Sequence, residues 1–330
     1  MTAISYRNTK TTLPNWVPTL HNDQPRGIAY ETDTHFVHFY GIDFGFWVIS
    51  TGLTVTEKKN GTLIEWVKRV FGAEDIQQSN NRIGYTVEAV WRPGLYYEKE
   101  LLDGLKISKT DQRSSEQALR LFIERLDELL LYIEPDTNGL KTYSHKTREL
   151  LILSCTEVEN NWKQYMRIAG AIPINNRDFT TKDYVKLSAL LYLPEFQVSL
   201  RPYTNIPSIR PFLGWNSSSP TQSLGWYSAY NKTKHDRNSH FAEATLDHCI
   251  QSIAANLVMY CVRFSPFPLV NASNTLSSLI KQLFVIDLFD CSSKSFYIPH
   301  IKLPNNIRED LWCGDTKNFV EPWEVSPLNL

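Results

Sequence analysis

Two long segments in the middle of the chain repeat apolar residues at helical spacing and are joined by a short turn. The first begins near Ser114, where a capping-box pattern occurs, and continues to Pro135. The second is expected from about Ser144 to Ile168. Because a short connection makes consecutive helices antiparallel neighbours, these segments predict a helical bundle.

The first third of the chain is rich in aromatic and β-branched residues, which favour strands. The strongest strand candidate is residues 34–50, with Gly41 and Gly45 as expected bends or bulges. The polar, proline-punctuated residues that precede this run are expected to form an extended arm on the surface. A short amphipathic helix is expected at Leu63 to Phe71. These patterns predict an aromatic β-rich domain or subdomain at residues 1–110.

The helical domain is predicted at residues 111–265, with an extended insertion at about 192–222. Period-two alternation, several prolines and a serine-rich turn mark the insertion. The last strong helix is expected from about Ser239 to Val262, and residues 266–330 are expected to form a loop-rich tail with one short helix. The predicted fold class is therefore α+β, with a β domain or subdomain followed by an antiparallel helical bundle.

Charge and cysteine content narrow the functional classes. Lys plus Arg number 34 and Asp plus Glu 35, so binding to nucleic acid or to an anionic membrane would need a local basic patch. No apolar segment reaches the roughly 18 residues of a membrane helix, and the polar N-terminus has no secretory signal pattern. We therefore expect a cytoplasmic protein without membrane contact. Its five scattered cysteines are expected to be reduced core thiols.

A polar, mostly basic cluster lies just before the last strong helix. If it is helical, Tyr227, Asn231 and His235 follow one another at intervals of four residues, with Lys234 close to the same line. Cleavage of RNA without a metal requires a group that titrates near neutrality, such as His235. It also requires a fixed cation for the phosphate, which Arg237 or Lys234 can supply, while the Asn231 amide can orient either partner. The alternative, a polar helix end that bonds to a neighbouring helix, stays open.

Other side chains are candidates for holding a polyanion. Arg201 and Arg210 lie in the insertion, which would form a wall or lid over the polar cluster. At the start of the second helix, a group of cations could face a polyanion or form a solvated first turn. The candidate substrate-binding residues are Tyr227, Tyr230, Arg201, Arg210, His145, Lys146 and Arg148. The acidic residues Glu157, Glu159 and Asp183 show no recognisable pairing.

The helical pair, the polar helix with Asn-x-x-x-His and the final long helix resemble HEPN (higher eukaryotes and prokaryotes nucleotide-binding) domains over about residues 114–262. The hallmark of that family is an arginine followed five residues later by a histidine, often with an asparagine directly after the arginine. Asn231 and His235 match the asparagine and the histidine, whereas Tyr230 occupies the position of the arginine. Either Lys234 or Arg237 replaces that cation, or the domain is a non-cleaving relative.

The resemblance implies a HEPN-like helical bundle and an RNA- or nucleotide-binding protein. Many HEPN domains are metal-independent ribonucleases whose paired motifs meet across a homodimer, and many act in toxin–antitoxin or antiviral systems. A homodimer, a protein partner in such a system and a role in bacterial defence or stress are therefore expected. We expect no cofactor and no metal, because none of the common nucleotide-binding, hydrolase or zinc-protease motifs occurs.

A second hypothesis is a non-catalytic HEPN-like interaction or dimerisation module, whose N-terminal domain recognises a partner or ligand. A third, a small-molecule enzyme with its pocket in the N-terminal domain, has no motif to support it.

Overall fold

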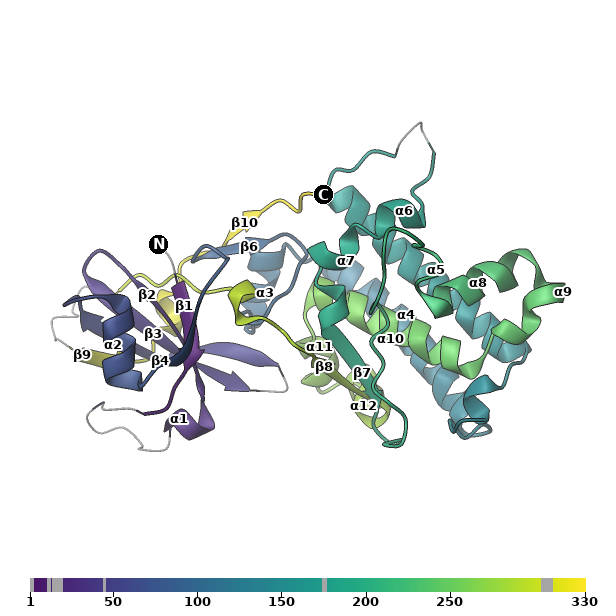
Figure 1. Cartoon of the computed structure of the whole chain (residues 1–330), viewed down its shortest axis with the longest axis horizontal. Coiled ribbons are helices and arrows are strands. Elements are labelled where there is room, and N and C mark those ends of the chain that lie inside the picture. The colour runs from purple at the N-terminus through teal and green to yellow at the C-terminus, as the bar shows by residue number, and fades with distance from the viewer. Residues whose placement is uncertain (1–2, 11–12, 14–19, 44–45, 174–176, 304–310) are drawn as a thin grey trace. The chain divides into compact units, whose positions relative to one another are not determined.

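The computed structural model describes residues 3–10, 13, 20–43, 46–173, 177–303 and 311–330. The chain forms two compact units, of which the first contains residues Met1–Lys106 and Cys291–Ser326 and the second contains Ile107–Asp290 and Pro327–Leu330. An antiparallel sheet dominates the first unit and helices dominate the second, so the α+β class is as predicted (Figure 1). The predicted tail, residues 266–330, is divided between the two units.

The first unit is built on a six-stranded sheet in which every neighbouring pair is antiparallel. The strand order is β5-β1-β2-β3-β4-β9. The strands are β1 (Ala3–Arg7), β2 (Arg26–Glu31), β3 (His35–Asp43), β4 (Trp47–Lys58), β5 (Glu74–Gln78) and β9 (Leu311–Gly314).

Both faces of the sheet are covered by apolar side chains. Helix α2 (Leu63–Phe71), which matches the predicted bounds, packs its buried Trp66 and Phe71 on one face (Figure 1). Its limits are set locally by a capping box at Thr62 and by Gly72 in the left-handed conformation. The other face packs against Ile298 and Ile301. Burial on both faces explains why β3 is almost continuously apolar instead of alternating.

Three predictions for this unit need correction or limits. The residues expected to form a surface arm instead include β1 and β2, since short strands with polar residues among their apolar ones give little periodic signal. The bulge expected at Gly41 is a register shift between Phe39 and Tyr40. Gly41 has another role, because a Cβ atom there would lie 1.8 Å from the indole of Trp47. Gly45 lies outside the described residues.

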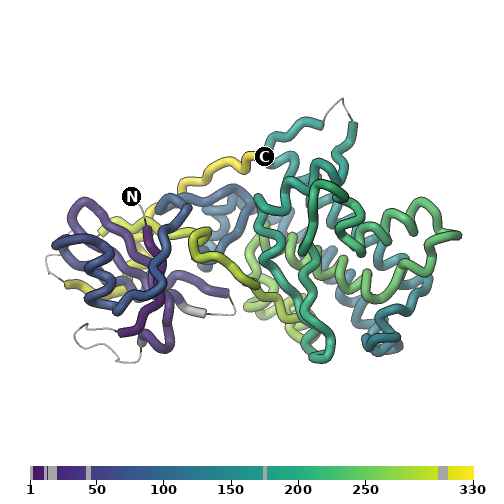
Figure 2. The backbone as a smooth tube through the Cα atoms, viewed as in Figure 1, coloured from purple at the N-terminus to yellow at the C-terminus, as the bar shows by residue number. Residues whose placement is uncertain are grey.

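The end of the chain returns to the first unit. Strand β9 extends the sheet beside β4, and β10 (Glu324–Ser326) pairs in parallel with β6 (Tyr85–Val87). Figure 2 shows this return as the yellow tube that runs among the purple and blue segments. The predicted loop-rich tail therefore contributes two strands, which pair with strands from the first part of the chain. Helices α1 (Leu20–Asp23) and α3 (Glu98–Leu105) and the 3-10 turns η5 (Ser293–Ser295) and η6 (Lys317–Phe319) complete the unit.

The second unit is organised around α10 (Leu246–Phe264), which is buried along almost its whole length. Helices α4 (Lys109–Leu130), α5 (His145–Ile168) and α8 (Gly225–His235) pack against it. The contact with α5 is close because both helices present small side chains there, and the hydroxyl oxygens of Ser154 and Ser252 lie 2.6 Å apart. The helical bundle expected for this part of the chain is therefore present.

Most predicted helices are present, with some shifted ends. Ser144 caps α5 as predicted, whereas α4 begins earlier than expected, because Ser108 and not Ser114 caps it. Similarly, Thr245 caps α10, so the helix expected from Ser239 starts later. Between α8 and α10 the chain forms α9 (Arg237–His240) and η4 (Phe241–Glu243). The cysteines at positions 155, 249 and 261 are buried on these helices, as their apolar positions predict.

The insertion is partly extended. Its alternating segment forms β7 (Phe196–Leu200), which pairs with β8 (Phe284–Leu288), and the rest consists mainly of turns. The shorter elements of this unit are η1 (Gly139–Lys141), α6 (Thr181–Tyr184), α7 (Leu187–Leu190), η3 (Leu193–Glu195), α11 (Phe267–Val270) and α12 (Thr275–Leu283). Within the described ranges, no helix combines the length and hydropathy of a membrane span.

Candidate functional site

The predicted polar helix is α8, and its two halves have different surroundings. In the first half, Trp226 is 1% exposed and donates its indole N–H to the carbonyl of Pro211 over 2.9 Å. Tyr227 is also buried, whereas Lys234 and His235 in the last turn are exposed. The aromatic first half therefore anchors the helix in the unit, and only its last turn can meet a ligand in solution.

Tyr230, at the position that the HEPN resemblance assigns to arginine, faces α5. Its hydroxyl lies 3.1 Å from Oε2 of Glu159, and Tyr227 donates a hydrogen bond to Oε1 of the same carboxylate. Burial, together with the bond to Glu159, raises the pKa of Tyr227, and burial also raises that of Tyr230. Both tyrosines are therefore neutral donors that hold α8 on α5.

Lys234 belongs to the same network. Its Nζ donates to the Tyr230 hydroxyl over 2.8 Å, and this bond raises the pKa of the lysine. Its ammonium group also lies 5.0 Å from the centre of the Tyr230 ring. The structure thus pairs Lys234 with Tyr230 and not with His235.

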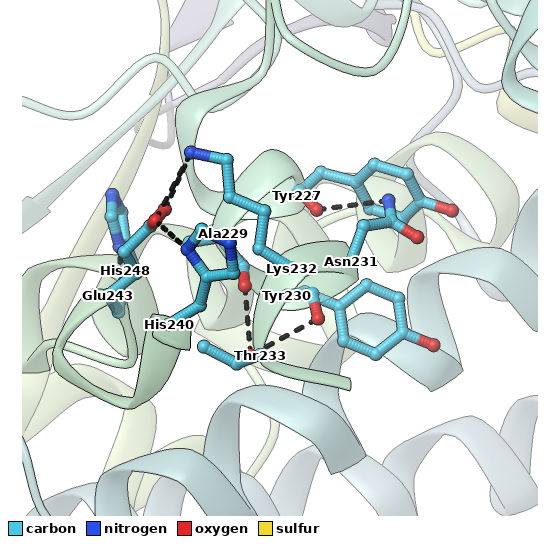
Figure 3. Close-up of polar contacts among 9 residues, drawn as sticks. All are labelled: Tyr227, Ala229, Tyr230, Asn231, Lys232, Thr233, His240, Glu243 and His248. Carbon is cyan, nitrogen blue, oxygen red and sulfur yellow. Dashed lines mark hydrogen bonds and ion pairs between the residues drawn. The ribbon is translucent and has the colours of Figure 1, made fainter. Parts of the chain in front are cut away.

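The remaining polar groups of α8 largely bond within the helix or to the segment that follows it (Figure 3). Asn231 donates to the carbonyl of Tyr227 over 3.2 Å, so one of its two amide hydrogens is already bonded. Glu243 accepts from Lys232 at 2.9 Å and also lies 2.7 Å from Nδ1 of His240. These contacts join the end of α8 to η4. They agree with the alternative in which the cluster is a polar helix end bonded to neighbouring segments.

His235 and Arg237 are the two predicted catalytic residues whose polar groups face solvent. His235 is exposed, and its side chain makes no hydrogen bond or ion pair with the rest of the described chain. Nη2 of Arg237 lies 3.4 Å from Nδ1 of His145, at the start of α5. Because a guanidinium group can only donate, Nδ1 of His145 is the acceptor in this contact. The structure therefore brings together an arginine of α9 and an imidazole of α5, and the exposed His235 lies two residues before that arginine in the sequence.

The ring of Phe241 packs against both Arg237 and His145. Its ring centre lies 5.7 Å from the Arg237 guanidinium carbon and 4.9 Å from the centre of the His145 ring. Arginine and histidine both pack well on aromatic faces. The aromatic ring thus restricts the positions of the two polar side chains.

Arg148 has a structural partner. Its Nε and Nη2 donate to the carbonyl oxygen of Thr233 over 3.3 and 3.0 Å, in the last turn of α8. The positive charge in the first turn of α5 is thereby placed against the carbonyl end of α8, which carries partial negative charge. Lys146, two residues before Arg148, instead pairs with Glu128 on α4 at 2.5 Å.

The two arginines of the insertion do not bond to α8. Arg210 donates twice to the carbonyl of Pro194, over 3.1 and 2.6 Å, and lies over the ring of Phe289. Arg201 is exposed and follows β7. The part of the insertion that does contact α8 is aromatic and packs on its buried first half, so the predicted basic lid is not formed by these contacts.

Glu159 and Glu243 are the residues that sequence reasoning missed. Glu159 follows directly after Val158, a member of the apolar seam of α5, and this flanking position is where a carboxylate can reach a neighbouring helix. Nothing in the sequence indicated that its partners would be two tyrosines. Glu243 lies in a stretch expected to be continuous helix, so its contact with Lys232 could not be anticipated.

Histidine, cysteine and carboxylate groups do not gather in a metal-binding arrangement in the described ranges of the chain. Comparisons of the chain with models of protein families, with curated proteins and with solved structures gave no match.

Proposed function

We propose that the second unit is a HEPN-like RNA- or nucleotide-binding domain, and that its exposed groups carry out metal-independent cleavage of RNA. The contact between Arg237 and His145 beside the exposed His235 is the observation that supports this proposal. A positioned cation and an exposed imidazole two residues apart in the sequence are the two parts that cleavage without a metal requires.

In this mechanism His235 is the general base or acid that moves the proton of the 2′-hydroxyl or of the leaving oxygen. Arg237, positioned by His145, holds the charge that develops on the phosphate. Lys234 and Asn231 each already donate one hydrogen bond, to Tyr230 and to the Tyr227 carbonyl, and in this proposal their remaining polar groups help to hold the phosphate and to orient a partner. A homodimer would bring two such surfaces together, and a role in bacterial defence or stress, with a protein partner, belongs to the same proposal.

A specific observation favours the second candidate, a non-catalytic interaction or dimerisation module. Tyr230, Lys234 and Glu159 form a closed network at the position where an active HEPN domain has its arginine. In place of the arginine, this position holds Tyr230, whose contacts with Glu159 and Lys234 stabilise the bundle. In that case His235 is a surface residue, and the unit acts by binding.

The decisive experiment incubates the purified chain with a mixed RNA in EDTA. His235→Ala should lower the cleavage rate by about 10²–10⁴-fold, as is usual when an acid–base group is removed. Arg237→Ala should lower both cleavage and RNA binding. Arg120→Ala is the matched control, because Arg120 is an exposed arginine on α4 that pairs with Glu124.

Intact RNA with the unaltered protein would refute cleavage. If Arg237→Ala then still lowers RNA binding while Arg120→Ala does not, this surface binds RNA without cleaving it. Intact RNA together with equal RNA binding by all three proteins would refute a role of this surface toward RNA and would favour the interaction module. The molar mass from light scattering tests the homodimer separately.

A further inference from the structure

A cavity of about 510 Å³ lies on the sheet of the first unit. Ile28 and Trp47, which line it, belong to the apolar cluster on the face away from α2. Strands β1, β2 and β5 form its floor, and residues 293–296 form part of its wall. Its size lies within the range of about 300–1,000 Å³ that is common for small-molecule sites.

The aromatic side of the cavity is a supported indole. The Trp47 ring lies directly over Gly41, where any Cβ atom would collide with it. It also stacks on Phe296, with ring centres 5.0 Å apart and planes at 27°. Phe296 is only 3% exposed, whereas Trp47 is half-buried. Gly41 and Phe296 therefore hold in place an aromatic surface that the cavity leaves accessible.

Two arginines give another part of the cavity lining a polar, cationic character. Arg7 and Arg26 face each other across β1 and β2, and directly opposed residues in an antiparallel pair project to the same face. Arg7 is neutralised by ion pairs with Glu74 and, at 3.5 Å, with Asp75. Arg26 is exposed, and its side chain has no hydrogen bond or ion pair with any other residue that the structure describes. The Arg26 guanidinium group is therefore the cation at this cavity that is left to pair with a bound anion.

Neutral hydrogen-bonding groups complete the lining. The Oγ atoms of Ser5 and Ser293 are 2.8 Å apart, and Ser293 Oγ lies 3.4 Å from Oε1 of Gln77. Hydroxyl and amide groups of this kind suit the hydroxyls of a sugar and the polar edge of a base. The cavity therefore combines an aromatic face, the exposed guanidinium of Arg26, the Asp75 carboxylate that pairs with Arg7, and neutral donors and acceptors.

We propose that this cavity is a nucleotide-binding site, in which Trp47 stacks on the base and Arg26, beside Arg7, binds the phosphate. The ligand is a nucleoside phosphate, either free or as one nucleotide of a single strand. Guanidinium groups match phosphate oxygens in geometry and charge, and stacking on an aromatic side chain accepts any base. This site is separate from the α8 surface of the second unit and does not depend on the function proposed for it.

The test titrates the full chain by calorimetry with the four ribonucleoside 5′-monophosphates and with an RNA decamer. Adenosine lacks the phosphate and inorganic phosphate lacks the base, so each should bind more weakly than the monophosphates. Arg26→Ala should weaken nucleotide binding by at least about 10-fold, the scale of a charge-assisted bond, while Arg26→Lys restores part of the affinity. Lys68→Ala is the control, since Lys68 is an exposed cation on α2, which covers the other face of the sheet.

Trp47→Ala should also weaken binding, by roughly 10-fold or more if the base stacks on the indole. Because that change uncovers Gly41, Trp47→Phe is measured beside it and unfolding is monitored for each variant. Monophosphate binding that requires Arg26 assigns the site to free nucleotides, and decamer binding alone that requires Arg26 assigns it to a strand.

The proposal is overturned if neither ligand binds, or if Arg26→Ala and Lys68→Ala bind equally well. His235→Ala should retain the nucleotide affinity of this cavity. The outcome here is thus distinguishable from the outcome for RNA cleavage.

Discussion

The hydroxyl of Tyr230 lies 3.1 Å from Oε2 of Glu159, and this contact joins α8 to α5. Lys234 donates to the same hydroxyl, so three side chains on two helices form one network. Position 230 is fully buried, and a cation placed there would meet the Glu159 carboxylate before it met solvent. The position therefore contributes to the packing of the bundle.

Removal of the Tyr230 hydroxyl should destabilise the second unit. Tyr230→Phe leaves Glu159 with one donor fewer, and we expect a loss of about 1 kcal/mol in the free energy of unfolding. Urea unfolding of both proteins measures this loss. Tyr132→Phe is the control, because Tyr132 is 80% exposed, and a loss of the same size in that variant would contradict the role of the network.

Arg148 should matter for stability more than for RNA binding. Its two hydrogen bonds to the Thr233 carbonyl cap the end of α8, so Arg148→Ala should cost roughly 1–2 kcal/mol of unfolding free energy. Arg125→Ala, which removes a surface pair with Glu128, should change stability by less than about 0.5 kcal/mol. If Arg148→Ala unfolds at the same urea concentration as the unaltered protein but binds RNA less tightly, its role is in the site.

His38 should make the first unit sensitive to acid. The ring is completely buried, stacks on Phe71 with centres 3.7 Å apart and lies 2.5 Å from the Tyr6 hydroxyl through Nδ1. Burial lowers the pKa of His38 well below its ordinary value of 6.5. The unfolded chain therefore binds a proton that the folded chain does not, and stability should fall as the pH drops below 6.5.

The slope of unfolding free energy against pH should approach about 1.4 kcal/mol per pH unit for this one group. Melting curves between neutral and mildly acidic pH measure it. His38→Gln lacks the titrating ring, so the difference in slope between the two proteins isolates the contribution of His38. Parallel curves would show that the ring is protonated in the folded state.

Glu100 should have the opposite pH dependence. Burial raises the pKa of Glu100 from 4.5 to about 7, against backbone N–H bonds from Tyr97 and Tyr96 that lower it. The folded chain keeps the proton that the unfolded chain has lost, so this group favours the folded state most below pH 4.5, and that contribution is lost as the pH rises to about 7. Glu100→Gln should raise the melting temperature above pH 7 and leave it nearly unchanged near pH 4. A variant that melts lower at both pH values would contradict this account.

Local signals in the sequence were sufficient for several helices. Thr62 and Gly72 delimit α2, and Ser144 begins α5, because caps act on backbone groups within a few residues. The same reasoning placed the start of α4 at Ser114 and missed the true cap, Ser108, since a polar first turn carries no apolar period. The helical pairing followed from the short connection alone.

Contacts that join distant parts of the chain were not predictable. Strand β9 has only four residues, and its partnership with β4 depends on a register that no local pattern encodes. The same limit applies to the candidate site, where Glu159 and His145 meet their partners only through the packing of α5 against α8 and the segment after it. The sequence showed which residues share one face of a helix. It did not show which residues of a neighbouring helix would lie against that face.

The return of residues 291–326 to the first unit makes the second unit an insertion within the first. As the chain is synthesised, residues 3–106 leave the ribosome before the strand that covers the edge of β4 and before Ile298 and Ile301, which cover one face of the sheet. Until that segment arrives, the sheet has an open edge and an uncovered apolar face, the two features that promote aggregation. The helical unit is continuous from Ile107 to Asp290 apart from the last four residues of the chain, so most of its core can form before residues 291–326 arrive. Folding of this chain should therefore finish where synthesis began.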